Sequence, residues 1–131
     1  LMADIMIETP LDGIVATNAT TSREGLTTSE KSLKNIGAGA VSGAPLTKRA
    51  IEVVARVYAR SKGTYPIIGV GGLMTPEDIK AMLAAGATLV QLYTGVVYEG
   101  MSLVRRTCKM MVAEATAEVQ QTNEQKPQAE G

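Results

Sequence analysis

Several residue types are missing from this 131-residue sequence, and each absence removes a class of function. There is no histidine, tryptophan or phenylalanine, and the aromatic residues are four tyrosines. Histidine-based metal binding and acid–base catalysis are therefore excluded, and side chains on which nucleic-acid bases stack are scarce. Basic and acidic residues number 13 each, so no net charge attracts nucleic acid or an anionic membrane. We expect no nucleic-acid partner.

Cysteine and long apolar runs are also scarce. The single cysteine, Cys108, cannot form an internal disulfide and is expected to be a small core residue. The sequence contains no cluster of metal-ligand type, so we expect no metal site. No apolar run approaches the roughly 18 residues of a transmembrane helix, and a reducing, cytosolic environment is the default. The chain begins at Leu1, in what reads as mid-helix, so we expect an N-terminal truncation.

Apolar runs alternate with amphipathic segments along most of the chain. The runs are short and mostly apolar, as is typical of strands buried on both faces. They cover residues 14–17, 66–70 and 88–93. The amphipathic segments predict helices, one of them opened by a threonine cap and a proline. They cover residues 2–7, 46–61, 75–86 and 102–119. Residues 18–45 show little periodicity and are predicted to form a long loop, either functional or disordered.

Alternation of strands and helices favours an α/β fold with a parallel sheet and right-handed crossovers. Both an open doubly wound sheet and a part of a β/α barrel fit this pattern. Three strands with helices on one side leave two open edges and an uncovered face, so we expect self-association through the open sheet edges. Residues 1–119 are expected to form this unit. Residues 120–131, rich in Gln, Glu, Lys and Pro, are expected to be a disordered tail.

Small and hydroxylated residues follow the second and third predicted strands. Gly71 and Gly72 end the second strand, where consecutive glycines let backbone N–H groups approach a phosphate. A tight strand-to-helix turn is the alternative, and neither a Walker A loop nor a dinucleotide fingerprint is present. Tyr93 and Thr94 end the third strand, one βα unit later. In β/α barrels the loops after the last two strands recurrently build a phosphate site.

Polar residues also follow the first predicted strand. Thr17 and Asn18 can hydrogen-bond a planar polar ligand, although an ordinary turn uses the same residue types. Ser42 and Gly43, just before Pro45, can bring backbone N–H groups to the same site or merely end the loop. The residues alone leave both pairs of alternatives open.

Five motifs, taken together and in order, resemble dihydroorotate dehydrogenase. The resemblance is greatest to its class 2, quinone-dependent, membrane-associated form, and it covers roughly residues 1–112. It implies the C-terminal portion, about three βα units, of a TIM (β/α)8 barrel. The motifs are DGIVATNAT at 12–20, SREGL at 22–26, VSGAPL at 41–46, PIIGVGG at 66–72 and LVQLYT at 89–94.

This resemblance implies a flavin enzyme of pyrimidine biosynthesis. In the family, dihydroorotate loses a proton to an enzyme base and a hydride to FMN, giving orotate, and a quinone reoxidises the flavin. Carried over by motif, Thr17 lies against FMN, Asn18 hydrogen-bonds the orotate ring, and Gly43 approaches the flavin. The residues implied to hold the FMN phosphate and ribityl chain, largely through the backbone, are Gly71, Gly72, Tyr93 and Thr94.

The sequence departs from the family pattern in two respects. Ala19 stands where the family has a second threonine, and the lost hydrogen bond is expected to weaken substrate binding by about 0.5–1.5 kcal/mol. The catalytic serine base, a flavin-contacting lysine and the quinone-channel helices belong to upstream segments that this sequence lacks. We therefore expect no catalytic residue in the chain and no activity from it alone. The full-length parent is expected to be cytoplasmic and peripheral at the inner membrane.

Two alternatives remain at the level of the sequence. One is a fragment of another FMN barrel oxidoreductase, such as a class 1 dihydroorotate dehydrogenase. The other is a non-catalytic module that keeps an FMN or phosphate pocket without chemistry.

Overall fold

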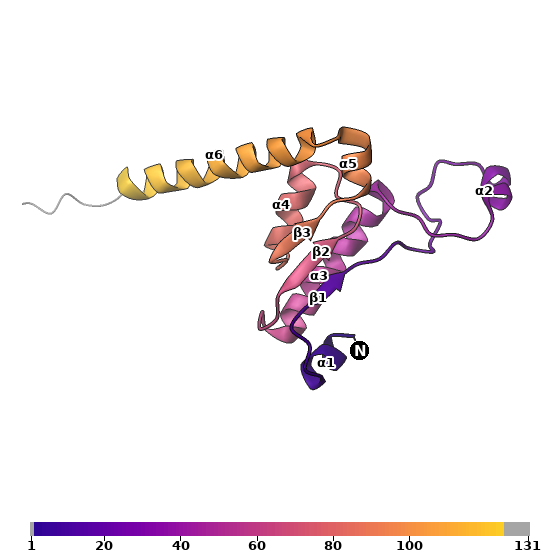
Figure 1. Cartoon of the computed structure of the whole chain (residues 1–131). Helices are drawn as coiled ribbons and strands as arrows, with labels where there is room; N and C mark the ends of the chain where they lie inside the picture. Colours follow the sequence, from indigo (N-terminus) through magenta and orange to yellow (C-terminus); the bar gives the residue numbers. More distant parts are fainter. Residues whose placement is uncertain (1, 125–131) are drawn as a thin grey trace, which may run out of the picture.

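The structure is a computed structural model that describes residues 2–124. Three short strands alternate with helices, and the strand order along the sheet follows the chain order (Figure 1). The elements are α1 (Met2–Glu8), β1 (Ile14–Ala16), α2 (Glu30–Ile36), the 3₁₀ turn η1 (Ala44–Leu46), α3 (Thr47–Ser61), β2 (Ile67–Val70), α4 (Pro76–Ala84), β3 (Leu89–Gln91), α5 (Thr94–Glu99) and α6 (Ser102–Glu124).

The three strands form one parallel sheet, as the alternating pattern predicts. Val15 of β1 pairs with Ile68 of β2, and Ile68 pairs in turn with Leu89 of β3. Because parallel strands need crossover connections, α3 joins β1 to β2 and α4 joins β2 to β3. The fold class expected from the sequence is therefore confirmed for these residues.

Helices α3 and α4 cover one face of the sheet and form the core with it. Along α3 the buried positions fall three or four residues apart, which places them on the side that faces the sheet. They are Ala50, Val54, Val57 and Ser61. Ile67 of β2 and Met82 of α4 are fully buried between the layers. The start of α6 completes this core, since Leu103 is also fully buried and α6 packs on α4.

The opposite face of the sheet lies open among residues 2–124. Val15 is 55% exposed and Leu89 62% exposed, and both lie in register with Ile68 on this face. Alternation along each strand sends one set of side chains to the helices and the other set to this open face. Parallel sheets in stable domains are covered on both faces. The described residues therefore form half of a layered structure, as expected from three strands with helices on one side.

The long loop and the chain end differ from expectation. Residues 18–45, predicted to lack regular structure, contain α2 and an isolated bridge between Thr20 and Val41. The loop carrying α2 extends well away from the sheet (Figure 1). Within the predicted tail, residues 120–124 continue α6, because the polar Gln, Thr and Glu side chains there do not oppose a helix that is already nucleated. Residues 125–131 lie outside the described part.

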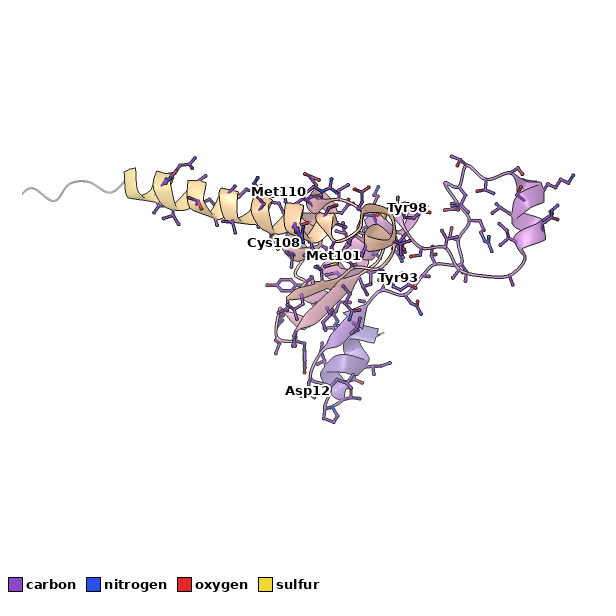
Figure 2. The ribbon with its side chains drawn as sticks, turned by 45° about the horizontal axis from the view of Figure 1, so that its top comes forward. Asp12, Tyr93, Tyr98, Met101, Cys108 and Met110 are labelled. Atoms are coloured by element: carbon purple, nitrogen blue, oxygen red, sulfur yellow. The ribbon has the colours of Figure 1, made fainter. Side chains whose placement is uncertain are left out.

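Two further differences concern the segment after β3. Residues 94–99 form a short helix, α5, that the pattern did not predict, ending at Gly100. Cys108 is exposed rather than part of the core, because the buried side of α6 runs through Leu103 and Thr107. Figure 2 shows Cys108 and Met110 on the first half of this helix. In residues 2–124 no helix combines the length and apolar character needed to cross a bilayer.

Replacing Thr75 with alanine is expected to destabilise the chain by about 1 kcal/mol. The Thr75 hydroxyl accepts a hydrogen bond from the Asp78 amide at 3.1 Å, and the Asp78 carboxylate accepts from the Thr75 amide at 3.0 Å, a reciprocal cap that opens α4. Urea unfolding of the variant measures the loss. Thr116→Ala is the control, since that hydroxyl only bonds to the Val112 carbonyl within α6. Equal effects of the two substitutions would contradict the capping role.

Candidate functional site

A pocket of about 220 Å³ lies at the carboxyl edge of the sheet, where β1, β2 and β3 all end. Its walls come from the loops after the three strands and from the turn before α3. The lining residues are Thr17, Asn18, Ala19, Ser42, Leu46, Val70, Gly71, Gly72, Leu73, Gln91, Tyr93 and Thr94. Ligand pockets in proteins usually measure about 300–1,000 Å³. The described residues therefore enclose less space than a complete small-molecule site usually does.

The strand ends meet here because the sheet is parallel and in register. Val70 of β2 pairs with Gln91 of β3, and the backbone amide of Thr17 donates to the Val70 carbonyl. The residues after these positions must therefore lie side by side at one edge of the sheet. This confirms the expectation that the segments 66–72 and 88–94 are parallel neighbours.

Glycine at position 72 is required by close packing of three backbone segments. Gly72 has φ +69°, and a Cβ added there would lie 2.3 Å from the Gly43 carbonyl oxygen and 2.7 Å from the Thr47 amide nitrogen. The Thr47 hydroxyl donates to the Gly72 carbonyl and fixes this approach. Residue 72 must therefore be glycine to pack against residues 43 and 47, and its backbone forms part of the pocket floor.

Gly71 precedes Gly72 in the chain and also lines the floor of the pocket. Its φ is +139°, and an added Cβ would lie 2.7 Å from the Ala50 Cβ and 2.9 Å from the Thr17 hydroxyl oxygen. The tight strand-to-helix turn and the ligand-binding interpretation were alternatives at the level of the sequence. In the structure the two glycines make the turn and line the pocket at once.

Hydroxyl groups converge on the pocket from three segments. The Ser42 and Thr94 hydroxyls lie 2.7 Å apart and share a hydrogen bond, which joins the end of the long loop to the start of α5. The Thr17 hydroxyl donates to the Val70 carbonyl at 3.3 Å. Asn18 is exposed at the rim, and its side-chain oxygen accepts from the Ala19 amide at 2.8 Å. Hydroxyl and amide groups both donate and accept hydrogen bonds.

The structure brings together the residues that the sequence singled out. Seven of them line the pocket directly: Thr17, Asn18, Ser42, Gly71, Gly72, Tyr93 and Thr94. Gly43 lies behind this wall, where an added Cβ would contact the Thr94 methyl group at 3.1 Å. Tyr93 is 79% exposed, so its ring contributes little to the enclosed part of the site. Figure 2 labels Tyr93 near the sheet edge that leads into α5.

The sequence analysis assigned no role to three apolar lining residues, although two of them, Leu46 and Val70, lie within the quoted motifs. Leu46 and Leu73 are buried beside the glycine floor, and Val70 precedes it. Their apolar side chains look like ordinary core residues in the sequence, so no local signal marks them. Gln91 was part of a quoted motif, and the alternation along β3 places it on the open face of the sheet.

The pocket is electrically neutral in its side chains. None of the residues that line it is an aspartate, glutamate, lysine, arginine or cysteine. Hydroxyls, amides and backbone groups are the only polar groups that the described walls offer. Such walls can bind a phosphate through neutral donors, but they contain no side chain that accepts a proton readily near neutral pH.

Comparison with known proteins identifies the family. Residues 1–114 match the sequence profile of the family described as dihydroorotate dehydrogenase. The chain belongs to the dihydroorotate dehydrogenase family. The resemblance that the five motifs indicate is thereby confirmed.

Relatives named dihydroorotate dehydrogenase (quinone) match over most of this chain and a small part of their own length. The protein from Thermosynechococcus vestitus is 49% identical over 121 residues, which is 88% of this chain and 33% of that relative. The protein from Thermobifida fusca is 50% identical over 105 residues, which is 80% of this chain and 28% of that relative. The chain thus spans about a third of the length of these dihydroorotate dehydrogenases.

The fold agrees with that of a solved dihydroorotate dehydrogenase. The crystal structure of DHODH from Eimeria tenella in complex with ferulenol superposes with a TM-score of 0.76 at 32% sequence identity. The match covers 90% of this chain and 31% of that enzyme. A ligand-free DHODH structure from the same organism gives a TM-score of 0.72 at 35% identity. The family therefore accounts for both the open face of the sheet and the partial pocket.

Proposed function

We propose that this chain supplies the phosphate-binding corner of the FMN site in a quinone-dependent dihydroorotate dehydrogenase. The observation that carries the proposal is the neutral pocket at the carboxyl edge of the sheet, with Gly71 and Gly72 as its floor and hydroxyls of Ser42 and Thr94 above them. Barrel enzymes place their phosphate sites at this edge, after their last strands.

The residues present fit a phosphate and part of a ribityl chain. The backbone of Gly71 and Gly72 lines the pocket, and no carboxylate in the described walls repels an anion. The volume of about 220 Å³ fits part of a flavin cofactor rather than the whole. The assignments are therefore Gly71, Gly72, Tyr93 and Thr94 for the phosphate and ribityl chain, with Thr17 and Gly43 nearer the ring.

Substrate binding in this proposal falls to Asn18. Its carboxamide lies at the pocket rim beside Thr17, where it can hydrogen-bond a planar ring such as that of dihydroorotate or orotate. Ala19 lines the same rim without a hydroxyl, so this side of the site offers the substrate one hydrogen bond fewer than a threonine would.

Catalysis requires groups that the described pocket does not contain. FMN held by Gly71, Gly72 and Thr94 would supply the redox chemistry between the substrate and the quinone. The described residues bind and orient, since none that lines the pocket readily accepts a proton near neutral pH. We therefore propose that the base and the quinone site come from the rest of a longer enzyme. That enzyme would oxidise dihydroorotate to orotate in pyrimidine biosynthesis, in the cytoplasm and peripheral at the inner membrane.

Titrating the 131-residue chain with FMN and with riboflavin tests the proposal. Riboflavin has the same ring and ribityl chain but no phosphate, so it is the matched control. We expect FMN to bind at least tenfold more tightly than riboflavin, followed by flavin fluorescence, and inorganic phosphate to compete with FMN. The same samples mixed with dihydroorotate and an electron-accepting dye should show no dye reduction.

Equal affinities for the two flavins, or no binding of FMN, would refute the phosphate corner. Dye reduction by the chain alone would show that it contains a catalytic base, against the proposal. The variant Ser42→Ala tests the position of the phosphate within the pocket. It should weaken FMN binding and leave riboflavin binding unchanged, because the Ser42 hydroxyl hydrogen-bonds to that of Thr94 beside the floor.

A further inference from the structure

The second half of α6 carries an apolar stripe that no described element covers. Every residue from 115 to 122 is exposed, and Figure 1 shows this half projecting away from the sheet and the other helices. Val112 is 66% exposed and Val119 60% exposed, with Ala115 between them at helical spacing. Together with Thr116 and Gln120 they line a shallow groove along the helix. We call Val112, Ala115 and Val119 the stripe.

The first half of the same helix is fixed to the body of the protein. Leu103 is fully buried, Thr107 is buried, and Lys80 of α4 forms an ion pair with Glu114 at 2.6 Å. The profile of the family also ends at residue 114. Residues 115–124 therefore extend past both the packed part of the helix and the part that the family profile matches.

The packed first half of α6 nucleates the projecting half, and a partner on the apolar side of that half would stabilise it further. Isolated helices shorter than about 12–15 residues are marginal in water, and helices in proteins owe most of their stability to the packing of an apolar face. The stripe is apolar enough to supply such a face, with three aliphatic side chains on successive turns.

Charge along α6 indicates what the partner is. Residues 102–111 contain Arg105, Arg106 and Lys109 and no acidic residue, whereas residues 112–122 contain Glu114 and Glu118 and no basic residue. Glu114 already pairs with Lys80 and Arg106 with Glu99, so a reversed second helix would meet chiefly Arg105, Lys109 and Glu118, which are complementary in sign. A parallel arrangement would set like charges beside each other, which is destabilising.

We propose that α6 of a second copy of this chain packs antiparallel on the stripe. Setting Val112 level with Ala115 of the second copy also sets Cys108 level with its Val119 and Lys109 level with its Glu118. The cationic half of each helix then faces the acidic half of the other. This contact is independent of the flavin site and of the open sheet.

The oligomeric state of the full 131-residue chain tests the contact. We expect a monomer–dimer equilibrium in sedimentation analysis, with the dissociation constant raised at least tenfold by Val119→Glu. Ala117→Glu is the matched control, because it adds the same charge on the opposite side of α6 and should change the constant less than twofold. A monomer at all concentrations, or association that Val119→Glu leaves unchanged, as pairing through the sheet edges would, overturns the proposal.

Disulfide trapping tests the direction of the pair. In the antiparallel pair two Cys108 residues lie about 16 Å apart along the axis, at 1.5 Å per residue, beyond the roughly 4.4–6.8 Å between Cα atoms of a disulfide. Val119→Cys should therefore form a covalent dimer on mild oxidation, whereas the unchanged chain should not. Rapid cross-linking of the unchanged chain through Cys108 would indicate a parallel pair and contradict the proposal.

Discussion

Replacing Gly72 with alanine is expected to lower the free energy of unfolding by about 2–5 kcal/mol and to abolish FMN binding. Two costs combine. Alanine at φ +69° is in the left-handed region, which costs about 1–2 kcal/mol. The added Cβ would also lie 2.3 Å from the Gly43 carbonyl oxygen, and relieving such overpacking costs about 1–3 kcal/mol. The two nearest atoms, the Gly43 carbonyl oxygen and the Thr47 amide nitrogen, belong to the backbone, so the clash cannot be relieved by moving a side chain.

Two other glycines separate these costs. Gly25 has φ +76° with open space around the added Cβ, so Gly25→Ala should show the backbone cost of about 1–2 kcal/mol alone. Gly39 has neither a positive φ nor a neighbour within 4 Å, and Gly39→Ala should be neutral or slightly stabilising. Urea unfolding followed by circular dichroism measures all three.

The order Gly72, Gly25, Gly39 in destabilisation is the expected result. If Gly72→Ala costs no more than Gly25→Ala, the loop at Gly43 yields easily and the floor of the pocket is not a fixed element. If the Gly72→Ala protein folds, its affinity for FMN is measured by titration. Retained FMN binding would show that the phosphate lies elsewhere.

The strands and the site could be predicted because both depend on short, local signals. Apolar runs mark β2 and β3, and the residues that follow them, such as Gly72 and Thr94, must meet once the sheet is parallel. The inference that β2 and β3 are parallel neighbours therefore placed Gly72 and Thr94, more than twenty positions apart in the sequence, in one pocket. The motifs added a family, and the comparisons confirmed it.

What could not be predicted depends on packing that has no local signal. Cys108 is exposed because the orientation of α6 on α4 sends Leu103 and Thr107 inward, and the sequence alone allows either side. The helix α2 has no buried residue, so its apolar pattern is too weak to predict it. The end of α6 was placed too early because polar residues such as Gln120 are compatible with both a helix and a disordered tail.

The one-sided sheet gives the second large expected effect. Ile67 of β2 is fully buried against α3 and α4, whereas Val15 of β1 points to the open face and is 55% exposed. Ile67→Ala removes buried methyl groups and leaves a cavity, so it should cost about 2–5 kcal/mol. Val15→Ala removes groups that water already contacts, so it should cost less than about 1 kcal/mol.

Urea unfolding of the 131-residue chain measures both variants. Because a domain is stable by only about 5–15 kcal/mol, Ile67→Ala can unfold the chain outright, and Ile67→Val, with an expected cost of about 0.5–1.5 kcal/mol, then supplies the value. A cost for Val15→Ala as large as that for Ile67→Ala would mean that the chain covers its second face in solution, by self-association through the sheet. In that event Val15→Ala should weaken association through the sheet, whereas Val119→Glu should weaken only the contact through α6, which separates the two surfaces.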